Sequence, residues 1–354
     1  MSAMKNLGYD VYFLAYDNRS YYLIHNDEKK PLKRIFATHS FVFHHILSYI
    51  CLYLSVLKVL RMFEWNKYDY AYIRSMPREF FWKRMKKEMW NLGMKIIVEN
   101  PTYMSKGAEE PMFYIRFLNT VLKIFGKDKY TTLYTLIGDK TEGCFNGTPA
   151  INIDNGIDVD LFEPRTPISH TGINFIAVGN IAYWHGFDRI IKGLASFKEE
   201  DIHLYLVGPD GDGSLSQCMR LAEKMEISHL VHAVGPKFGE ELTSLLNKCD
   251  VAFASLAISR KKLESASSLK NREYCARGIP FVFASEDPVL SQHPMEFVMQ
   301  IPDDETPVPI KKVISFSKGL PNNEAPSIMR RYAEEYMTWE SQFKKVFDYL
   351  ESIN

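Results

Sequence analysis

The segment with the clearest chemical signature is residues 267–282, which read SSLKNREYCARGIPFV. Small hydroxyl residues precede a predicted helix that ends in glycine, and a predicted strand follows at once. Free amides at a helix N-terminus, together with the helix dipole, favour an anion. Ser267 and Ser268 can cap this helix and donate to a phosphate, and Lys270 adds a full charge. Glu273 lies one turn into the helix, where a carboxylate can accept both hydroxyls of a ribose.

The same helix has a plainer interpretation, which the residues alone leave open. Serine caps are common, and Glu273 could meet Lys270 or Arg277 on the helix surface as an ordinary ion pair. In that case the segment is a capped helix with no ligand.

A second segment, residues 177–189, reads AVGNIAYWHGFDR. A predicted strand ends in glycine, a loop carries Trp-His-Gly, and a helix begins. In an open parallel sheet, ligands bind at the carboxyl ends of the strands. His185 and Arg189 are therefore suited to hold a diphosphate as cations or donors. The alternative is a loop histidine beside an Asp188 helix cap.

Short β-rich runs alternate with helical patterns along the chain, which predicts parallel sheets covered by helices and hence an α/β fold. In the first half we expect strands at 10–16, 34–37, 70–74, 95–99 and 132–136, with helices over 41–65, 78–92 and 110–126. In the second half we expect strands at 172–178, 203–207, 231–234, 251–254 and 280–284, with helices over 186–199, 214–226, 239–247 and 270–277.

A chain of 354 residues predicts two domains. We expect an N-terminal Rossmann-like domain over 1–152, a linker over 153–171, and a C-terminal Rossmann-like domain over 172–325. The linker carries Asn155-Gly156, a tight-turn dipeptide. Residues 326–354 form a predicted amphipathic helix whose aromatic face includes Tyr332, Tyr336, Trp339 and Phe343. Because that face is too large to leave exposed, we expect the helix to cross back onto the N-terminal domain.

Charge and cysteine usage narrow the class of protein. The 43 basic residues balance the 43 acidic ones, so no global field draws the chain to nucleic acid. The five cysteines are widely spaced and form no C-x-x-C pair, which predicts a reducing, cytoplasmic compartment and no structural metal. The apolar stretch 41–63 contains charged residues and is better explained by a buried helix than by a membrane span.

Residues 77–95 carry more basic than acidic groups, interleaved with aromatic and methionine side chains. Such a helix can lie among lipid headgroups, which would place the protein peripherally at the inner face of the membrane. The alternative is a crossover helix whose Phe81, Met85 and Met89 cover the sheet while its lysines are solvated.

Taken in order, these segments resemble family-4 retaining glycosyltransferases of the GT-B fold, of the bacterial surface-polysaccharide type. The likeness runs from about residue 68 to 350. The matching residues are Asn155-Gly156-Ile157-Asp158 with Phe162, Val178-Gly179-Asn180, His185-Gly186-Phe187-Asp188, and the run from Glu273 to Val282.

The resemblance implies two Rossmann-like domains facing across a cleft, with the nucleotide-diphosphate sugar on the C-terminal one. Glu273 matches the glutamate that holds the donor ribose, and amides around Ser267, Ser268 and Leu269 match the loop that cradles the diphosphate and sugar. The donor loop after the first C-terminal strand corresponds to Gly179, Asn180 and Gly186.

The chain also departs from the family pattern. The family's arginine and lysine on the diphosphate fall at Asn180 and His185. His185 can still supply charge, and Lys270 and Arg189 would compensate. An earlier family glutamate falls at Ser265. The family's first strand and glycine loop precede the helix that here is residues 1–7, so by this comparison the N-terminal domain lacks its first strand.

The implied activity is transfer of a sugar from a nucleotide-diphosphate donor to a glycan or lipid-linked acceptor, with retention, in polysaccharide biosynthesis. His185 and Lys270 are the expected catalytic residues because they can stabilise the departing diphosphate. No metal and no cofactor are expected. Two alternatives stay open: a GT-B nucleotide-sugar epimerase, and a catalytically weak GT-B partner subunit.

Overall fold

The computed structural model describes most of the chain. The described residues are 2–17, 20–34, 50–52, 54–59, 61, 68–74, 79–100, 129–137, 143–145, 147–197, 201–321 and 323–353. The helix expected over 110–126 and most of the one expected over 41–65 lie outside these ranges.

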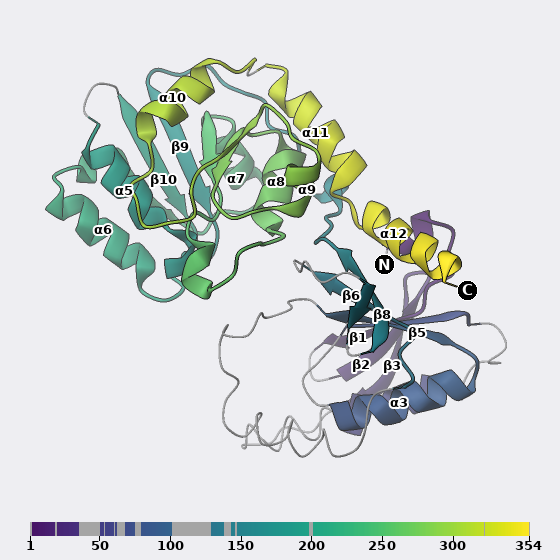
Figure 1. The fold of residues 1–354 in the computed structure, drawn as a ribbon. Coiled ribbons are helices and arrows are strands. Elements are labelled where there is room, and N and C mark those ends of the chain that lie inside the picture. Colours follow the sequence, from purple (N-terminus) through teal and green to yellow (C-terminus); the bar gives the residue numbers. More distant parts are fainter. Residues whose placement is uncertain are drawn as a thin grey trace. The chain divides into compact units, whose positions relative to one another are not determined.

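The described chain divides into two compact units, each with its own sheet (Figure 1). The N-terminal unit runs to Ile153 and also includes the chain from Phe343 onward. The C-terminal unit comprises residues 154–342.

The C-terminal unit is built on a six-stranded sheet with the order β11-β10-β9-β12-β13-β14. Every neighbouring pair of these strands is parallel, which confirms the α/β class. The strands are β9 (Ile173–Val178), β10 (Ile202–Val207), β11 (Val231–Gly235), β12 (Val251–Phe253), β13 (Phe281–Phe283) and β14 (Val298–Gln300). The helices are α5 (Phe187–Ala195), α6 (Ser214–Lys224), α7 (Gly239–Leu246), α8 (Leu269–Arg277), α9 (Pro288–Gln292), α10 (Ile310–Lys318) and α11 (Ala325–Tyr336).

Helices cover both faces of this sheet, and neighbouring residues of β9 separate the two layers. Phe175 packs in the core made with α5, α6 and α10, whereas Ile176 packs in the core made with α7, α8, α9 and α11. Both side chains are fully buried. A strand buried on both faces reads as a continuous apolar run, which is why the sequence located β9 well.

The N-terminal unit contains a five-stranded sheet with the order β4-β5-β6-β8-β7, in which only β7 runs antiparallel to its neighbour. Its strands are β4 (Tyr70–Arg74), β5 (Lys95–Asn100), β6 (Leu133–Ile137), β7 (Gly143–Phe145) and β8 (Thr148–Ile153). Helices α1 (Ser2–Asn6) and α3 (Glu79–Asn91) belong to it as well, and residues 50–52, 54–59 and 61 are also helical, within the helix expected over 41–65. The helix expected over residues 1–7 is present as α1, and Gly8 follows it with φ +87°.

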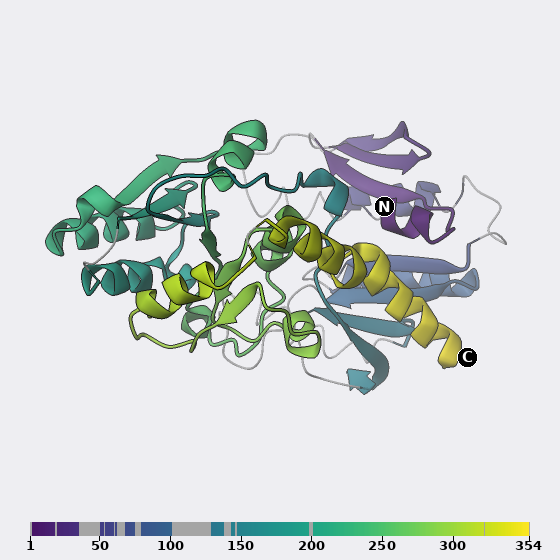
Figure 2. The same cartoon turned by 90° about the horizontal axis from the view of Figure 1, so that it is seen from above.

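A separate three-stranded antiparallel sheet is formed early in the chain (Figure 2). It consists of β1 (Phe13–Asp17), β2 (Ser20–His25) and β3 (Glu28–Arg34). Asn26 and Asp27 join β2 to β3 with φ of +46° and +67°. Asn and Asp tolerate this left-handed turn, which closes a two-residue hairpin. The strand expected over 10–16 overlaps β1, whereas the hairpin of β2 and β3 was overlooked although its Asn-Asp turn is present in the sequence. Of the strand expected over 34–37, only Arg34 lies within the described residues.

The segment expected as a linker packs on the C-terminal unit. A Cβ added to Gly156 would lie 2.5 Å from the backbone nitrogen of Trp339. Arg165 is 4% exposed, and its guanidinium donates to the carbonyls of Gly278 and Cys249 at 2.9 and 2.6 Å. These buried hydrogen bonds attach residues 154–165 firmly to the sheet layer that carries α8.

The single C-terminal helix expected over 326–354 is two helices, α11 and α12 (Trp339–Ser352). Tyr332 and Tyr336 pack against the core of the C-terminal unit. Phe343 and Phe347 belong to the N-terminal unit, where their rings meet Tyr72, and Tyr9 and Tyr70, respectively.

Helix α3 covers the N-terminal sheet as the crossover alternative predicted, since Met85 and Met89 are buried in the core of that unit. Lys86 is also buried, at 7% exposure, and donates to Thr131 Oγ1 at 3.2 Å. It is therefore not available to reach lipid, contrary to the membrane interpretation. Within the described residues, no helix is long and apolar enough to span a bilayer.

Candidate anion site at the carboxyl edge of the C-terminal sheet

The floor of the site is formed by the backbone of glycine residues at the ends of neighbouring strands. Gly179 follows β9 with φ +147°, and Gly208 follows β10 with φ +139°. A Cβ on Gly208 would lie 1.8 Å from the carbonyl oxygen of Gly179, so only glycine allows the two loops to meet. The amide of Gly208 donates in turn to the carbonyl of Gly235, which ends β11, at 3.0 Å.

Lys270 stands over this floor from the first turn of α8. Its ammonium nitrogen is 2.8 Å from the position that a Cβ on Gly179 would occupy, and 5.1 Å from the centre of the Phe187 ring. The nitrogen is buried and has no hydrogen-bond partner among the described residues. Burial lowers the pKa of Lys270 to about 7, against a smaller opposing effect of Glu273. A buried ammonium without an acceptor is costly, which marks this place as one suited to an anion.

His185 lies beside Lys270 in a one-turn helix, η3 (Tyr183–His185). Its Nδ1 accepts a hydrogen bond from the backbone amide of Ala182 at 3.2 Å, which leaves the proton on Nε2. Burial first, and then the charges of Lys270 and Lys261, lower the pKa of His185 to about 3. The expectation that His185 supplies charge was therefore wrong, because at neutral pH it offers only a neutral N–H donor.

The N-terminus of α8 is uncapped by side chains. Ser268 occupies the N-cap position in an extended conformation and makes no side-chain capping bond. Ser267 is buried, and its hydroxyl oxygen accepts the Asn155 amide at 2.8 Å, so neither serine caps as expected. Leu269, the first helical residue, is 57% exposed. The first amides of the helix, which have no intrahelical acceptors, remain available to an anion.

Glu273 makes the ion pair that the plainer interpretation predicted. Its Oε1 accepts a hydrogen bond from Arg277 Nε at 2.9 Å, one turn along α8. The side chain is 29% exposed, and Oε2 has no hydrogen bond to any described residue. The pair fixes the carboxylate while leaving one oxygen open to solvent, so both interpretations are compatible with this geometry.

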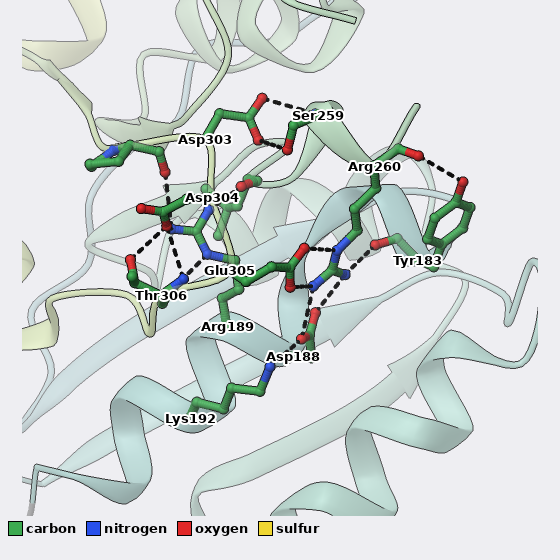
Figure 3. Close-up of polar contacts among 12 residues, drawn as sticks. Tyr183, Asp188, Arg189, Lys192, Ser259, Arg260, Asp303, Asp304, Glu305 and Thr306 are labelled. Carbon is green, nitrogen blue, oxygen red and sulfur yellow. Dashed lines mark hydrogen bonds and ion pairs between the residues drawn. The ribbon is translucent and has the colours of Figure 1, made fainter. Parts of the chain in front are cut away.

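Arg189 does not belong to the site. Its side chain is fully buried, and every nitrogen of the guanidinium donates within the protein. The acceptors are the carbonyls of Thr306, Leu256 and Pro302 and the carboxylate of Asp304. The expectation that Arg189 binds a diphosphate was wrong, because the guanidinium instead holds the loops after β12 and β14 against α5 (Figure 3).

Two other residues of the expected donor loop have mainly structural roles. Gly186 has φ +68°, and a Cβ there would lie 2.8 Å from the Cβ of Ala257, so it permits close packing of two loops. Asn180 is exposed, and its amide oxygen lies against Gly211. A neutral amide at this position provides no charge.

Sequence reasoning missed Gly208 and the basic run Arg260-Lys261-Lys262. Both had a signal. Three strands end in Val-Gly, at 178–179, 207–208 and 234–235, and the basic run lies in the loop that leads into α8. Ser265 Oγ, in the same loop, is buried without a hydrogen-bond partner among the described residues. No group of three or more metal-ligating side chains occurs in the part of the chain that the structure describes.

The N-terminal unit carries a polar cluster of its own at the carboxyl ends of β4, β5 and β6. The hydroxyl of Tyr72 donates to Glu99 Oε2 at 2.7 Å and lies 3.3 Å from Thr135 Oγ1. Glu99 is 5% exposed, whereas Arg74, 3.5 Å from its other oxygen, is largely exposed. Burial and the neighbouring Glu99 raise the pKa of Tyr72, so it stays protonated and acts as a donor.

Comparison with known proteins agrees with this architecture. Residues 158–292, which lie in the C-terminal unit, match the family model "Glycosyl transferases group 1". Among curated proteins, no sequence match was found. The chain as a whole has an α/β fold with parallel sheets that matches glycosyltransferases of the GT-B type.

Three solved structures illustrate the likeness. A sucrose-phosphate synthase from Thermosynechococcus elongatus superposes with a TM-score of 0.62 at 13% identity, over 99% of this chain and 92% of that one. A glycosyltransferase from Rickettsia africae gives 0.61 at 12% identity, over 91% and 84% of the two chains. The Anabaena protein HepE, solved in complex with UDP, gives 0.57 at 13% identity, over 84% and 82%. At these identities the likeness establishes the fold and no more.

Proposed function

We propose that this protein is a glycosyltransferase that binds a nucleotide-diphosphate sugar on its C-terminal unit. The observation that carries the proposal is Lys270, a buried ammonium without an acceptor, at the uncapped N-terminus of α8 and above the glycine floor at Gly179. The match of residues 158–292 to glycosyl transferases group 1 supports it, as does the UDP held by the HepE structure of similar fold.

In the proposed reaction the bond between the sugar C1 and the diphosphate oxygen breaks, and a hydroxyl oxygen of the acceptor forms a bond to C1. The nucleoside diphosphate leaves, and the proton of the acceptor hydroxyl passes to it. Negative charge grows on the leaving phosphate, so groups that stabilise it lower the barrier. Lys270 supplies charge, the first amides of α8 supply dipoles, and His185 supplies a neutral Nε2–H. Glu273 would accept the ribose hydroxyls with Oε2, the oxygen that the pair with Arg277 leaves open.

The finer features are part of the same proposal. We propose retention of anomeric configuration, no required metal, and a glycan or lipid-linked acceptor met by the N-terminal unit. The polar cluster of Tyr72, Arg74 and Glu99 is the candidate acceptor contact there, because it combines a buried carboxylate with an exposed cation. The setting would be polysaccharide biosynthesis at the cytoplasmic side of a membrane.

A panel of UDP-, GDP-, dTDP- and ADP-sugars, scored by thermal shift, tests the donor. A ligand at one hundred times its dissociation constant adds about 2.7 kcal/mol, which raises the melting temperature by several degrees. The stabilising donor is then incubated with acceptor glycans and the products are identified. Sugar transfer supports the proposal. Release of an epimerised nucleotide sugar identifies an epimerase, binding without turnover identifies a partner subunit, and no binding at all refutes the proposal.

Kinetics of two variants separate binding from catalysis. Lys270→Met and His185→Ala are expected to lower kcat more than they raise the donor KM, because their contacts strengthen as charge develops. A change confined to KM would show that neither residue has a catalytic role.

A further inference from the structure

A second ammonium group, that of Lys261, lies near the His185 ring and comes from a different structural element than Lys270 does. It ends the short helix η5 (Ile258–Lys261), and its Nζ lies 3.9 Å from the centre of the Trp184 ring. The Trp184 and His185 ring centres are 5.7 Å apart. Lys270 approaches the same imidazole from α8, and the charges of both lysines act on it.

No carboxylate of a described residue neutralises the charge of Lys261. Among the described residues Lys261 makes no ion pair, and its one contact of note is the face of Trp184. Three arginines of this region are paired: Arg189 with Asp304 and three carbonyls, Arg260 with Asp188 and Glu305, and Arg277 with Glu273. Lys261 and Lys270 are the cations whose charges act on His185, and neither forms an ion pair with a described residue.

Arg260, the residue before Lys261, is held by several polar contacts, which Figure 3 shows. Its guanidinium bonds both oxygens of Asp188, at 2.8 and 3.0 Å, and both oxygens of Glu305, at 2.9 and 2.6 Å. It also donates to the carbonyl of Tyr183 at 2.5 Å, and the Tyr183 hydroxyl returns a bond to the Arg260 carbonyl at 3.1 Å. We refer to these contacts of Arg260 as the Arg260 clamp. Bidentate guanidinium–carboxylate pairs are rigid, so the clamp holds η5 against the loop that carries His185.

We infer that Lys261 is a second diphosphate-binding cation of the site, held in place by the Arg260 clamp. The inference rests on the proposed function, since it assigns Lys261 to the ligand proposed there. A nucleoside diphosphate carries more than one negative charge, and Lys270 alone compensates one. His185 and Asn180 are neutral, which leaves Lys261 as the described side chain placed to compensate another.

Calorimetry of the full chain with nucleoside diphosphates tests the assignment. Wild type, Lys261→Gln and Lys262→Gln are titrated with UDP, GDP, dTDP and ADP, and with the monophosphate of whichever base binds. Lys262 is the matched control, because it is the next residue and an exposed lysine for which no side-chain contact with a described residue is found. We expect Lys261→Gln to weaken diphosphate binding about tenfold or more, as for one charge-assisted contact, and monophosphate binding far less. Lys262→Gln should bind as wild type does.

The clamp is tested by a double-mutant cycle. Glu305→Gln removes one carboxylate from Arg260 and is expected to weaken diphosphate binding in the wild-type background but not in the Lys261→Gln background. An equal effect of Glu305→Gln in both backgrounds would show that the clamp does not act through Lys261. Unliganded melting temperatures identify any variant that has lost its fold.

The outcomes separate this inference from the proposed function. Binding by wild type with unchanged affinity in Lys261→Gln overturns the assignment of Lys261 alone. An equal loss in Lys261→Gln and Lys262→Gln also overturns it, because the effect would then be one of general charge. Failure of wild type to bind any of the four diphosphates overturns both.

Discussion

The ammonium of Lys270 and the backbone of Gly179 occupy adjoining space: a Cβ on Gly179 would stand 2.8 Å from Lys270 Nζ and 2.7 Å from its Cε. The two residues are far apart in sequence and come from a strand end and a helix start. Each residue alone is a weak sequence signal: Gly179 belongs to a Val-Gly strand ending, and Lys270 follows shortly after two serines. Their contact in the folded protein brings the two together in one site.

Replacing Gly179 with alanine should therefore disable the site through Lys270. The added methyl group would displace the lysine, and φ +147° is strained for any side chain. We expect nucleoside-diphosphate affinity, measured by calorimetry, to fall at least tenfold. Gly235→Ala is the control, because it places a methyl group at a strand end of the same sheet with φ +71° and meets nothing within 4 Å. If both variants bind alike, the contact with Lys270 has no role in binding.

Diphosphate binding should take up a proton above neutral pH. The pKa of Lys270 is lowered to about 7 by burial, so at pH 8 most of the free protein carries the neutral amine. A bound diphosphate stabilises the charged form and raises that pKa, as a neighbouring opposite charge does. Affinity should fall as pH rises above 7, and calorimetry in buffers of different ionisation enthalpy should show uptake of about one proton at pH 8. Lys270→Met should abolish the uptake; its persistence would assign the proton to another group.

The lowered pKa of Lys270 also predicts how the stability of the folded protein changes with pH. Between pH 7 and the ordinary lysine value, the unfolded chain binds a proton at Lys270 that the folded chain does not. Stability from this group therefore rises with pH across that window. The melting temperature of Lys270→Met, relative to wild type, should fall as pH increases from 7 to 10.

Glu273→Gln tests the ribose contact. Removal of the charge should weaken nucleotide binding by about 1.5–3 kcal/mol, or roughly 10- to 150-fold, if Oε2 accepts ribose hydroxyls. The control is the ligand: inorganic pyrophosphate has no ribose, so its binding should be the same in variant and wild type. Equal losses for UDP and pyrophosphate would show that Glu273 acts only by fixing Arg277 and the start of the site.

How far the sequence could predict this molecule differs between its two halves. The strands of the C-terminal sheet are buried on both faces and bounded by helices, so apolar runs located β9 to β13 within a residue or two. The short edge strand β14 has too little pattern to be found. In the N-terminal half, β7 and β8 form a small antiparallel pair. The prediction assumed parallel strands and therefore did not include this pair.

The roles of individual site residues were harder to predict from the sequence than the strands were. Positions such as Lys270 and Glu273 follow from the helix start, which is a local signal. The role of Arg189 could not be predicted, because its acceptors lie between 67 and 117 positions away in the chain. Nor could the neutral state of His185, which depends on burial and on two lysines brought in by folding.

Membrane contact by α3 can be tested with the cations that remain outside the core. Sedimentation with phosphatidylglycerol vesicles should show binding that falls with salt and with the double change Lys83→Glu and Lys87→Glu. Lys86 is excluded from the test because it is buried. The double change Lys311→Glu and Lys312→Glu, at two exposed positions at the start of α10, reverses equal charge as a control. Wild type that stays in the supernatant at low salt would show α3 to be an ordinary crossover helix.

The last helix should contribute strongly to the stability of the N-terminal unit through Phe347. Its ring is 6% exposed, stacks on Tyr9 with centres 4.3 Å apart, and meets Tyr70 edge-on at 5.2 Å. Phe347→Ala removes both contacts and leaves a cavity, which should lower the free energy of unfolding by about 3 kcal/mol or more. Asp348→Ala, at the next and exposed position, should change it by less than about 0.5 kcal/mol. Urea unfolding followed by tyrosine fluorescence and circular dichroism measures both. A loss of under about 1 kcal/mol in Phe347→Ala would mean that residues 343–352 are held to this unit mainly by other contacts.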